Sequence, residues 1–292
     1  MSRNLLLGLL AALLAALIGT GWQLVSRHGV TTSLGPIELA VLRYGLPALM
    51  LSPCLRGLGL LPAGVPRLVL LLLVAGGGLP FGLLVLSGAQ FAPAAHIGVF
   101  LSGAMPLFAA LLAWRVEGER FNALRKAGLL LVALGVAILG SAGWGNASWR
   151  GDLLFLLAAL AWAVYTLAFR RSGLTPWQGA ALVNAWSALL LLLVLPWLGA
   201  PRLLTAPWPD LAFQVVWQGG IAGVLGLVTY TAAVVRLGAA RAALSSALVP
   251  PMTALGAFWV LGEPLAASSG LAVALVAWGV AVAGLSGMAR RA

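Results

Sequence analysis

Long apolar stretches follow one another along nearly the whole chain, with only short polar connections between them. A helix needs about 20 apolar residues to cross the hydrocarbon core of a bilayer, and these stretches reach that length. Because 62% of the residues are hydrophobic and only 8% are charged, a water-soluble domain could not bury this much apolar surface. The stretches do not alternate with polar residues, which indicates helices and not barrel strands. The sequence therefore predicts an all-α integral membrane protein.

We predict ten transmembrane helices. The first apolar run is longer than the apolar core of a signal peptide, so we assign it to the first helix. No connection has room for a separate soluble domain, so the function is expected inside the helix bundle. The predicted spans cover residues 4–26, 36–55, 68–88, 93–114, 126–143, 151–169, 177–198, 211–235, 240–261 and 267–288.

The net charge of +11 is spread over the connections and forms no single basic face, so no nucleic-acid partner is expected. Cytoplasmic loops of membrane proteins carry an excess of Lys and Arg. With a cytoplasmic N-terminus, 13 of the 17 Lys and Arg residues fall on the cytoplasmic side. The opposite connections hold only Arg27, Arg150 and Arg202. This bias predicts an even number of spans, with the N- and C-termini both cytoplasmic.

One segment recurs in similar form half a chain later: LVALGVAILG at 131–140 and LVAWGVAVAG at 275–284. The alignment of the two halves extends to Pro106 with Pro250, and to the "GE" at 118–119 with the "GE" at 262–263. It divides the chain into residues 1–145 and 146–292, with five predicted helices each. Because five is odd, the second half must enter the membrane from the opposite side. The sequence thus predicts two inverted-topology repeats, a frequent architecture of secondary transporters.

Several of these motifs carry a resemblance to a known family. They are the two "GE" pairs, the doubled segment, and "LRY" at 42–44. On them the chain resembles the EamA family of the drug/metabolite transporter superfamily, and within it the bacterial amino-acid and metabolite exporters. The resemblance covers the whole chain. It implies a multi-pass protein of the bacterial inner (plasma) membrane, with a central cavity that opens alternately to either side.

Glycine and proline interruptions occur at matching places in the two halves. In transporters such interruptions are the best sequence indication of the binding site, although close packing of helices also uses glycine. We therefore expect the third, fourth, eighth and ninth helices to line a cavity. The candidate hinge residues are Gly77, Gly78, Pro80, Pro106, Gly219, Gly220 and Pro250.

Polar and aromatic side chains within the spans are the candidates for contact with a substrate, since polar groups in a membrane usually face the bundle interior. Asn184 and Gln218 rank first, because an amide is expected not to bond back to its own helix as Ser and Thr do. Arg43 either attracts a substrate carboxylate or ties helices together through carbonyls, and the second is favoured. The candidates are Gln90, His96, Ser102, Asn184, Gln218, Tyr230, Ser245, Arg43, Trp22 and Tyr165.

The acidic residues all lie in loops or near span ends, so no midspan carboxylate is expected to carry protons. His96 remains open as a proton carrier, although an interior hydrogen bond is the favoured interpretation. With Cys54 as the only cysteine and no histidine pair, we expect no metal site. The absence of a P-loop pattern excludes ATP hydrolysis by this chain, and no cofactor is expected.

The sequence thus predicts an alternating-access exporter of small metabolites, with amino acids (aromatic ones included) as the favoured substrates. Its expected partners are the small-molecule substrate and the lipid bilayer, and a monomer is compatible with the sequence. Three alternatives remain. A sugar-phosphate or nucleotide-sugar exchanger would need several buried cations, and an intramembrane lipid-processing enzyme would need catalytic groups at depth. The third is a non-transporting membrane scaffold.

Overall fold

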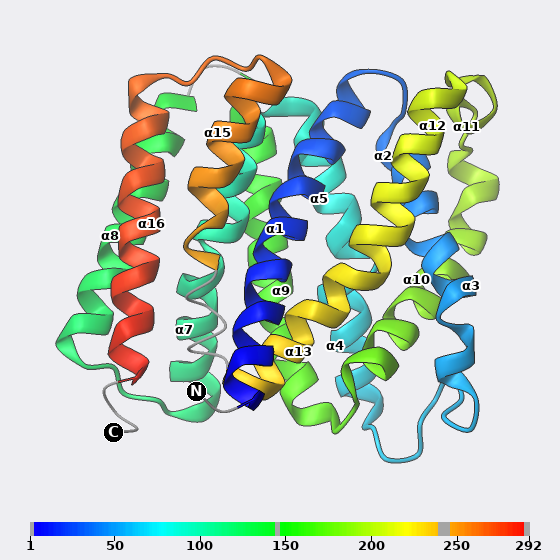
Figure 1. Ribbon diagram of the computed structural model, residues 1–292, viewed down its shortest axis with the longest axis horizontal. Coiled ribbons are helices and arrows are strands. Elements are labelled where there is room, and N and C mark those ends of the chain that lie inside the picture. The colour runs from blue at the N-terminus through cyan, green and yellow to red at the C-terminus, as the bar shows by residue number, and fades with distance from the viewer. Residues whose placement is uncertain (1–2, 144–146, 239–245, 289–292) are drawn as a thin grey trace.

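The computed structural model describes residues 3–143, 147–238 and 246–288. Figure 1 shows a bundle of helices, and no strand occurs within these ranges. Eight of the described helices are long and apolar enough to cross a membrane. They span Arg3–Thr31, Arg67–Phe91, Ala94–Glu117, Ala123–Ala142, Ser148–Ser172, Pro176–Leu198, Trp208–Leu237 and Ala267–Leu285. The protein is therefore an all-helical, multi-pass membrane protein.

Several long helices are divided by local changes in winding into separately labelled elements. The first part of the chain contains α1 (Arg3–Thr31), α2 (Pro36–Ala40), η1 (Val41–Gly45), α3 (Leu46–Met50), η2 (Ser52–Leu55), α4 (Arg67–Gly77), α5 (Leu79–Phe91), α6 (Ala94–His96), η3 (Ile97–Gly103), α7 (Met105–Glu117) and α8 (Ala123–Gly143). The second part contains α9 (Ser148–Ser172), α10 (Pro176–Leu198), α11 (Arg202–Thr205), α12 (Trp208–Gln214), η4 (Val215–Gly226), α13 (Leu227–Leu237), α15 (Val249–Leu261) and α16 (Ala267–Met288).

The predicted span 36–55 is not one regular α-helix. It begins with α2, widens into the π-helical turn η1, continues as α3 and ends in the 3₁₀ turn η2. Pro47 has no N–H to donate to the carbonyl of Arg43, and its ring crowds that carbonyl, so the turn before it widens. The π-helical η3 has the same relation to Pro106, which lies one turn beyond Ser102. Prolines thus set the irregular winding of both segments.

The two ends of the bundle can be told apart by the chain termini. In Figure 1, α1 begins and α16 ends at one end, which we call the termini end. The α1–α2 and α15–α16 connections lie at the opposite end, which we call the far end. Both α7 and α15 have 13 residues, and each is followed by a glycine with positive φ, Gly118 (65°) or Gly262 (68°). The two helices run toward opposite ends of the bundle, α7 toward the termini end and α15 toward the far end.

The doubled segment lies in α8 and α16, which pack side by side (Figure 1). Their backbones meet at two glycines. A Cβ atom on Gly128 would lie 2.5 Å from the backbone nitrogen of Ala283 and 2.6 Å from the carbonyl oxygen of Gly279. A Cβ atom on Gly279 would lie 2.6 Å from the carbonyl oxygen of Gly128. Glycine is therefore required on both helices for this close approach.

Candidate functional site

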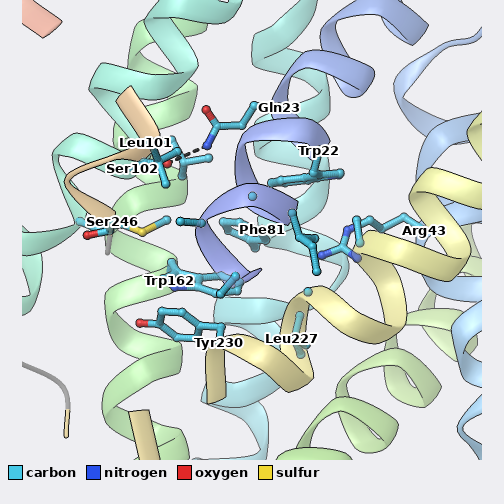
Figure 2. Close-up of a pocket in the computed structure, with 18 residues that line it drawn as sticks. Trp22, Gln23, Arg43, Phe81, Leu101, Ser102, Trp162, Leu227, Tyr230 and Ser246 are labelled. Atoms are coloured by element: carbon cyan, nitrogen blue, oxygen red, sulfur yellow. Dashed lines mark hydrogen bonds between the residues drawn. The ribbon is translucent and has the colours of Figure 1, made fainter. Parts of the chain in front are cut away.

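A cavity of about 110 Å³ lies near the middle of the bundle, bounded by helices from both parts of the chain (Figure 2). One wall is α1, which supplies small residues such as Ala15 and Gly19, and also Trp22 and Gln23. The other lining residues include Arg43 of η1, Phe81 of α5, Leu101 and Ser102 of η3, Met105 of α7, Trp162 of α9, Leu227 and Tyr230 of α13, and Val249 of α15. The predicted third, fourth, eighth and ninth spans thus all contribute, together with three others.

Four aromatic rings form a continuous row along the cavity. The ring centroids are 5.9 Å apart for Trp22 and Phe81, 4.9 Å for Phe81 and Trp162, and 5.1 Å for Trp162 and Tyr230. These spacings allow favourable contacts between neighbouring rings. Figure 2 shows the row following the cavity from the Trp22 side to the Tyr230 side. The row gives the cavity an apolar face that suits a hydrocarbon or aromatic group.

Arg43 supplies the charge of this cavity. Its side chain is directed toward the cavity in Figure 2, and the residue is only 4% exposed. The guanidinium carbon lies 5.0 Å from the ring centre of Trp22 and 5.6 Å from that of Tyr44, within range of a cation–π interaction. Nε and Nη1 have no hydrogen-bond partner among the described residues. Glu38 is no counter-ion, since its carboxylate accepts hydrogen bonds from the backbone N–H groups of Gly35 and Arg202.

The break between α4 and α5 at Gly78 is held by two side chains from other helices. The hydroxyl of Tyr44 donates to the carbonyl oxygen of Gly78 at 2.6 Å. The hydroxyl of Ser187 accepts from the backbone N–H of Leu79 at 2.9 Å. The bond from Leu79 satisfies a backbone N–H that the interrupted helix leaves free, as the low dielectric of a membrane requires. The Tyr44 hydroxyl adds a second donor to the Gly78 carbonyl, which also accepts from the N–H of Gly82.

A hydrogen-bonded network joins α1 to α12 and η4 on the far-end side of the cavity. Trp22 Nε1 donates to Gln218 Oε1 at 2.8 Å, and Gln218 Nε2 donates to Ser26 Oγ at 3.0 Å. Gln214 Nε2 donates to the carbonyl oxygen of Val25 at 3.0 Å. Each of these bonds connects a residue of the first half with a residue of the second.

Gln23 makes a second connection of this kind. Its amide nitrogen donates to Ser102 Oγ at 2.7 Å, and its carbonyl oxygen accepts from Thr253 Oγ1 at 3.1 Å (Figure 2 shows the first bond). All three residues are buried. The amide therefore holds α1, η3 and α15 together at the edge of the cavity.

An ion pair near the far end continues this series along α1. Arg27 Nε lies 2.6 Å from Glu263 Oε1, and Arg27 Nη1 donates to the carbonyl oxygen of Ala89 at 2.6 Å. The other carboxylate oxygen of Glu263 accepts from the backbone N–H of Ala94 at 2.7 Å. We call these four residues the far-end clamp. It ties the connection after α15 to α1, α5 and α6.

The sequence places every acidic residue in a loop or near a span end, but the structure buries two of them, Glu38 and Asp152. Asp152, in the second turn of α9, is 5% exposed, and its Oδ1 lies 2.7 Å from Nδ1 of His96, which is 8% exposed. Oδ2 of Asp152 has no partner among the described residues. In the sequence, Asp152 lies at the start of the predicted span 151–169. In the structure, α5 and η3 pack against α9 and cover this residue.

We expect Asp152→Ala and His96→Ala each to lower the free energy of unfolding by about 3–5 kcal/mol, because each leaves a buried polar partner without its hydrogen bond. The double variant should lose less than the sum of the two single losses, since the second substitution breaks no further pairing. Denaturant unfolding in detergent micelles measures the three values. Glu117→Gln is the control, because its pairs with Arg170 and Arg171 are 3.6 and 3.7 Å long and partly exposed. Strictly additive losses would show that the two side chains are not coupled.

The structure brings four of the predicted substrate contacts to the cavity: Trp22, Arg43, Ser102 and Tyr230. Five others lie elsewhere. Gln90 is exposed near the end of α5, while His96, Tyr165, Asn184 and Gln218 are buried outside the cavity lining. Ser245 lies outside the described residues.

The reason for ranking Asn184 first is wrong. Its amide nitrogen donates to the carbonyl oxygen of Ala180, one turn back on the same helix, at 2.8 Å, and to that of Gly223 at 3.3 Å. An amide can therefore bond back to its own helix, as Ser and Thr do. Gln218 is also fully bonded, although its network ends at the cavity residue Trp22.

The predicted hinge residues serve mainly in packing, and none lines the cavity. A Cβ atom on Gly77 would touch the ring of Tyr165, and one on Gly219 would touch Leu46. Gly78 marks the α4–α5 break, with Pro80 in the first turn of α5. Gly220 has open space around it. Pro106 and Pro250 lie in the first turns of α7 and α15.

Sequence reasoning missed Gln23 and Phe81 as cavity residues. Gln23 had a usable signal, because an amide within a continuously apolar span usually faces the bundle interior. No sequence signal marked Phe81, since a phenylalanine in an apolar helix is equally favourable in contact with lipid.

Comparison with known proteins gives matches over the whole chain. The model of the EamA-like transporter family matches residues 6–141 and again residues 149–285. A solved crystal structure of a protein 25% identical in sequence has a TM-score of 0.64, with all of both chains covered.

Two curated bacterial proteins are similar to part of the chain. An uncharacterised protein of Pseudomonas aeruginosa is 34% identical over 186 residues, which are 62% of this chain and 63% of that protein. A probable terminal-alkyne amino-acid exporter of Streptantibioticus cattleyicolor is 32% identical over 174 residues, 56% of this chain and 57% of that protein. The chain thus matches less than two thirds of the length of these relatives. Together with its apolar helices and central cavity, the family match across both halves shows that this chain belongs to the EamA-like transporter family.

Proposed function

We propose that this protein is an alternating-access carrier, and not an enzyme, that exports small amphipathic metabolites, above all amino acids, across the bacterial inner membrane. In this proposal ten helices form two inverted repeats, residues 1–145 and 146–292, with both termini in the cytoplasm. The observation that carries it is a central cavity between the two halves, with the buried hydrogen bonds of Trp22 and Gln23 and the short Arg27–Glu263 ion pair joining the halves on its far-end side. At the termini end the halves are joined by the longer and partly exposed pairs of Glu117 with Arg170 and Arg171.

The far-end clamp supports two alternating states through the symmetry of the repeats. The sequence offset of 143 that aligns Gly8 with Gly151 also aligns Arg27 with Arg170. The "GE" motifs align Glu263 with Glu119. In the inverted arrangement, the counterpart of the Arg27–Glu263 pair is therefore an Arg170–Glu119 pair at the termini end.

Only one of these two pairs is formed in the described structure. Arg27 and Glu263 are 2.6 Å apart, whereas Glu119 pairs instead with Arg125 of its own half at 2.7 Å. Arg170 lies near Glu117 at 3.6 Å, and the two side chains are 48% and 28% exposed. We infer that the far end is clamped in this state, and that the Arg170–Glu119 pair forms when the termini end closes.

The lining of the cavity supports an amphipathic substrate. The aromatic row offers an apolar face, and Ser102, Gln23 and Arg43 place polar groups beside it. The similarity to a protein named as a probable amino-acid exporter favours the same substrate class here. A sugar phosphate or nucleotide sugar is less well supported, since Arg43 is the single cation among the described lining residues and phosphate sites favour several.

Counterflow in proteoliposomes tests this function. Purified protein is reconstituted into liposomes loaded with unlabelled amino acid, and uptake of the same labelled compound is followed for a broad amino-acid panel. We expect protein-dependent exchange of apolar and aromatic amino acids, and little exchange with Trp162→Ala, which interrupts the aromatic row. Protein-free liposomes are the control. The absence of exchange for every amino acid would overturn the proposed substrate class, and a comparison with and without a pH gradient would show whether protons are coupled.

A further inference from the structure

The cavity contains a buried cation whose counter-charge is missing. Arg43 is 96% buried, and two of its three guanidinium nitrogens have no hydrogen-bond partner in the described part of the chain. The nearest acid along the chain, Glu38, is already occupied by backbone N–H groups. No acidic residue is among the described lining residues. The described lining of the cavity therefore supplies no counter-charge for this guanidinium.

Such an arrangement is unfavourable unless a ligand completes it. A buried charge without a partner costs several kcal/mol, and the rings of Trp22 and Tyr44 compensate for part of this cost. A guanidinium group presents a planar fork of N–H donors that matches the two oxygens of a carboxylate. In Figure 2 this group is directed toward the space beside Trp22, Phe81 and Leu227. The cavity thus has an anion-binding group at one side and an apolar row at the other.

We propose that Arg43 binds the carboxylate of the transported molecule, and that the cavity selects small monocarboxylates with an apolar body, whether or not they carry an amino group. This inference rests on the proposed transport function and defines the group by which the substrate is recognised. A single cation fits one carboxylate better than a phosphate group with two negative charges. The small cavity, about 110 Å³, also favours a small ligand.

The amino group of an amino acid has no acidic partner in this cavity. The described lining residues offer it only hydroxyl and amide oxygens and the faces of aromatic rings. The carboxylate therefore contributes the charge recognition, and a neutral hydroxyl group in place of the amine should be tolerated. A 2-hydroxy acid with the same side chain is then a substrate, whereas an amino-acid amide is not.

Three related compounds test the inference: L-leucine, its 2-hydroxy analogue 2-hydroxyisocaproate, and L-leucinamide. Each competes in counterflow of labelled leucine, and its binding is measured separately by thermal stabilisation of the protein in detergent. We expect 2-hydroxyisocaproate to compete about as well as leucine. Leucinamide should be at least about tenfold weaker, because a hydrogen-bonded charge contributes about 1.5–3 kcal/mol.

The variants Arg43→Gln and Arg43→Lys test whether Arg43 causes the preference for leucine over leucinamide. Arg43→Gln should remove the difference between leucine and leucinamide, and Arg43→Lys should retain part of it, because it keeps the charge but not the fork. Arg150→Gln is the matched control, since Arg150 also lies over a tryptophan ring, that of Trp149, but at an exposed position outside the cavity. It should behave as wild type. The unfolding temperature of Arg43→Gln should not fall, because the substitution removes an unpaired buried charge.

The possible failures are distinguishable. Equal competition by leucine and leucinamide in the wild-type protein, or an unchanged preference in Arg43→Gln, overturns the role of Arg43 while leaving transport intact. Rejection of 2-hydroxyisocaproate overturns the independence from the amino group. If the wild-type protein exchanges none of these compounds, the proposed function fails, and the binding measurements still decide whether Arg43 recognises a carboxylate. If Arg43→Gln does not fold, the wild-type comparison and Arg43→Lys decide the question.

Discussion

Glu263→Ala is expected to open the cavity toward the far end of the bundle. The substitution removes the ion pair with Arg27 and the hydrogen bond from the N–H of Ala94. Each bond to a charged group contributes about 1.5–3 kcal/mol, so the equilibrium between far-end-closed and far-end-open states should shift on the order of 100-fold. Exchange in proteoliposomes should fall steeply, because the carrier would rarely return to the clamped state.

Cysteine labelling measures this shift directly. Met105 lines the cavity, and Cys54 is the only cysteine of the chain, so Met105→Cys in a Cys54→Ser background provides a single reporter. A membrane-impermeant maleimide is added to vesicles of either orientation. We expect labelling from the far end to rise strongly in Glu263→Ala.

Glu119→Ala is the matched control for the clamp. The "GE" motifs align Glu119 with Glu263, but in this structure Glu119 pairs with Arg125. Its loss should leave the far-end clamp intact and weaken the opposite state, so labelling from the far end should fall or stay low. If both variants shift the labelling in the same direction, the two glutamates are not opposing gates.

Gly128→Ala is expected to cause a large loss of stability for a single added methyl group. Its Cβ atom would lie 2.5 Å from the nitrogen of Ala283 and 2.6 Å from the carbonyl oxygen of Gly279. Both are backbone atoms, so α8 and α16 must separate to admit the methyl group. Overpacking of this kind costs about 1–3 kcal/mol. Unfolding in detergent micelles, followed by near-ultraviolet circular dichroism, measures the loss.

Gly270→Ala controls for the general effect of replacing glycine in a helix. Gly270 lies in α16, and a Cβ atom there would meet nothing within 4 Å. Since alanine is the better helix former, this variant should be as stable as wild type or slightly more stable. Equal behaviour of the two variants would show that the α8–α16 contact tolerates expansion.

The sequence predicted the type of protein well, because the relevant signals are local. A helix within lipid must satisfy its own backbone hydrogen bonds, so length and continuous apolarity identify it without knowledge of its neighbours. The "GE" motifs likewise correspond to matching helix ends, since the positive φ of Gly118 and Gly262 is a local requirement. The span 36–55 was less well described, because Pro47 changes the winding of the turn before it.

The candidate site was predicted only in part. Trp22, Arg43, Ser102 and Tyr230 were named and do line the cavity, but Gln90 and Asn184 were named on equal grounds and do not. These helices are apolar nearly all round, so the sequence pattern does not tell which face is turned inward. A polar residue in a span is equally compatible with the cavity, with a bond to its own helix or with a contact to a neighbour.

By itself, the sequence determined a helical membrane protein with a repeated segment, because lipid imposes the same local requirement on every span. The tertiary structure decided which side chains meet. Arg27 and Glu263 are separated by 236 positions, and Trp22 and Gln218 by 196. It also buried Asp152 against His96 and placed the guanidinium of Arg43 in the lining of the cavity. The physical reason is that such contacts depend on how whole helices pack, which no local stretch of the chain specifies.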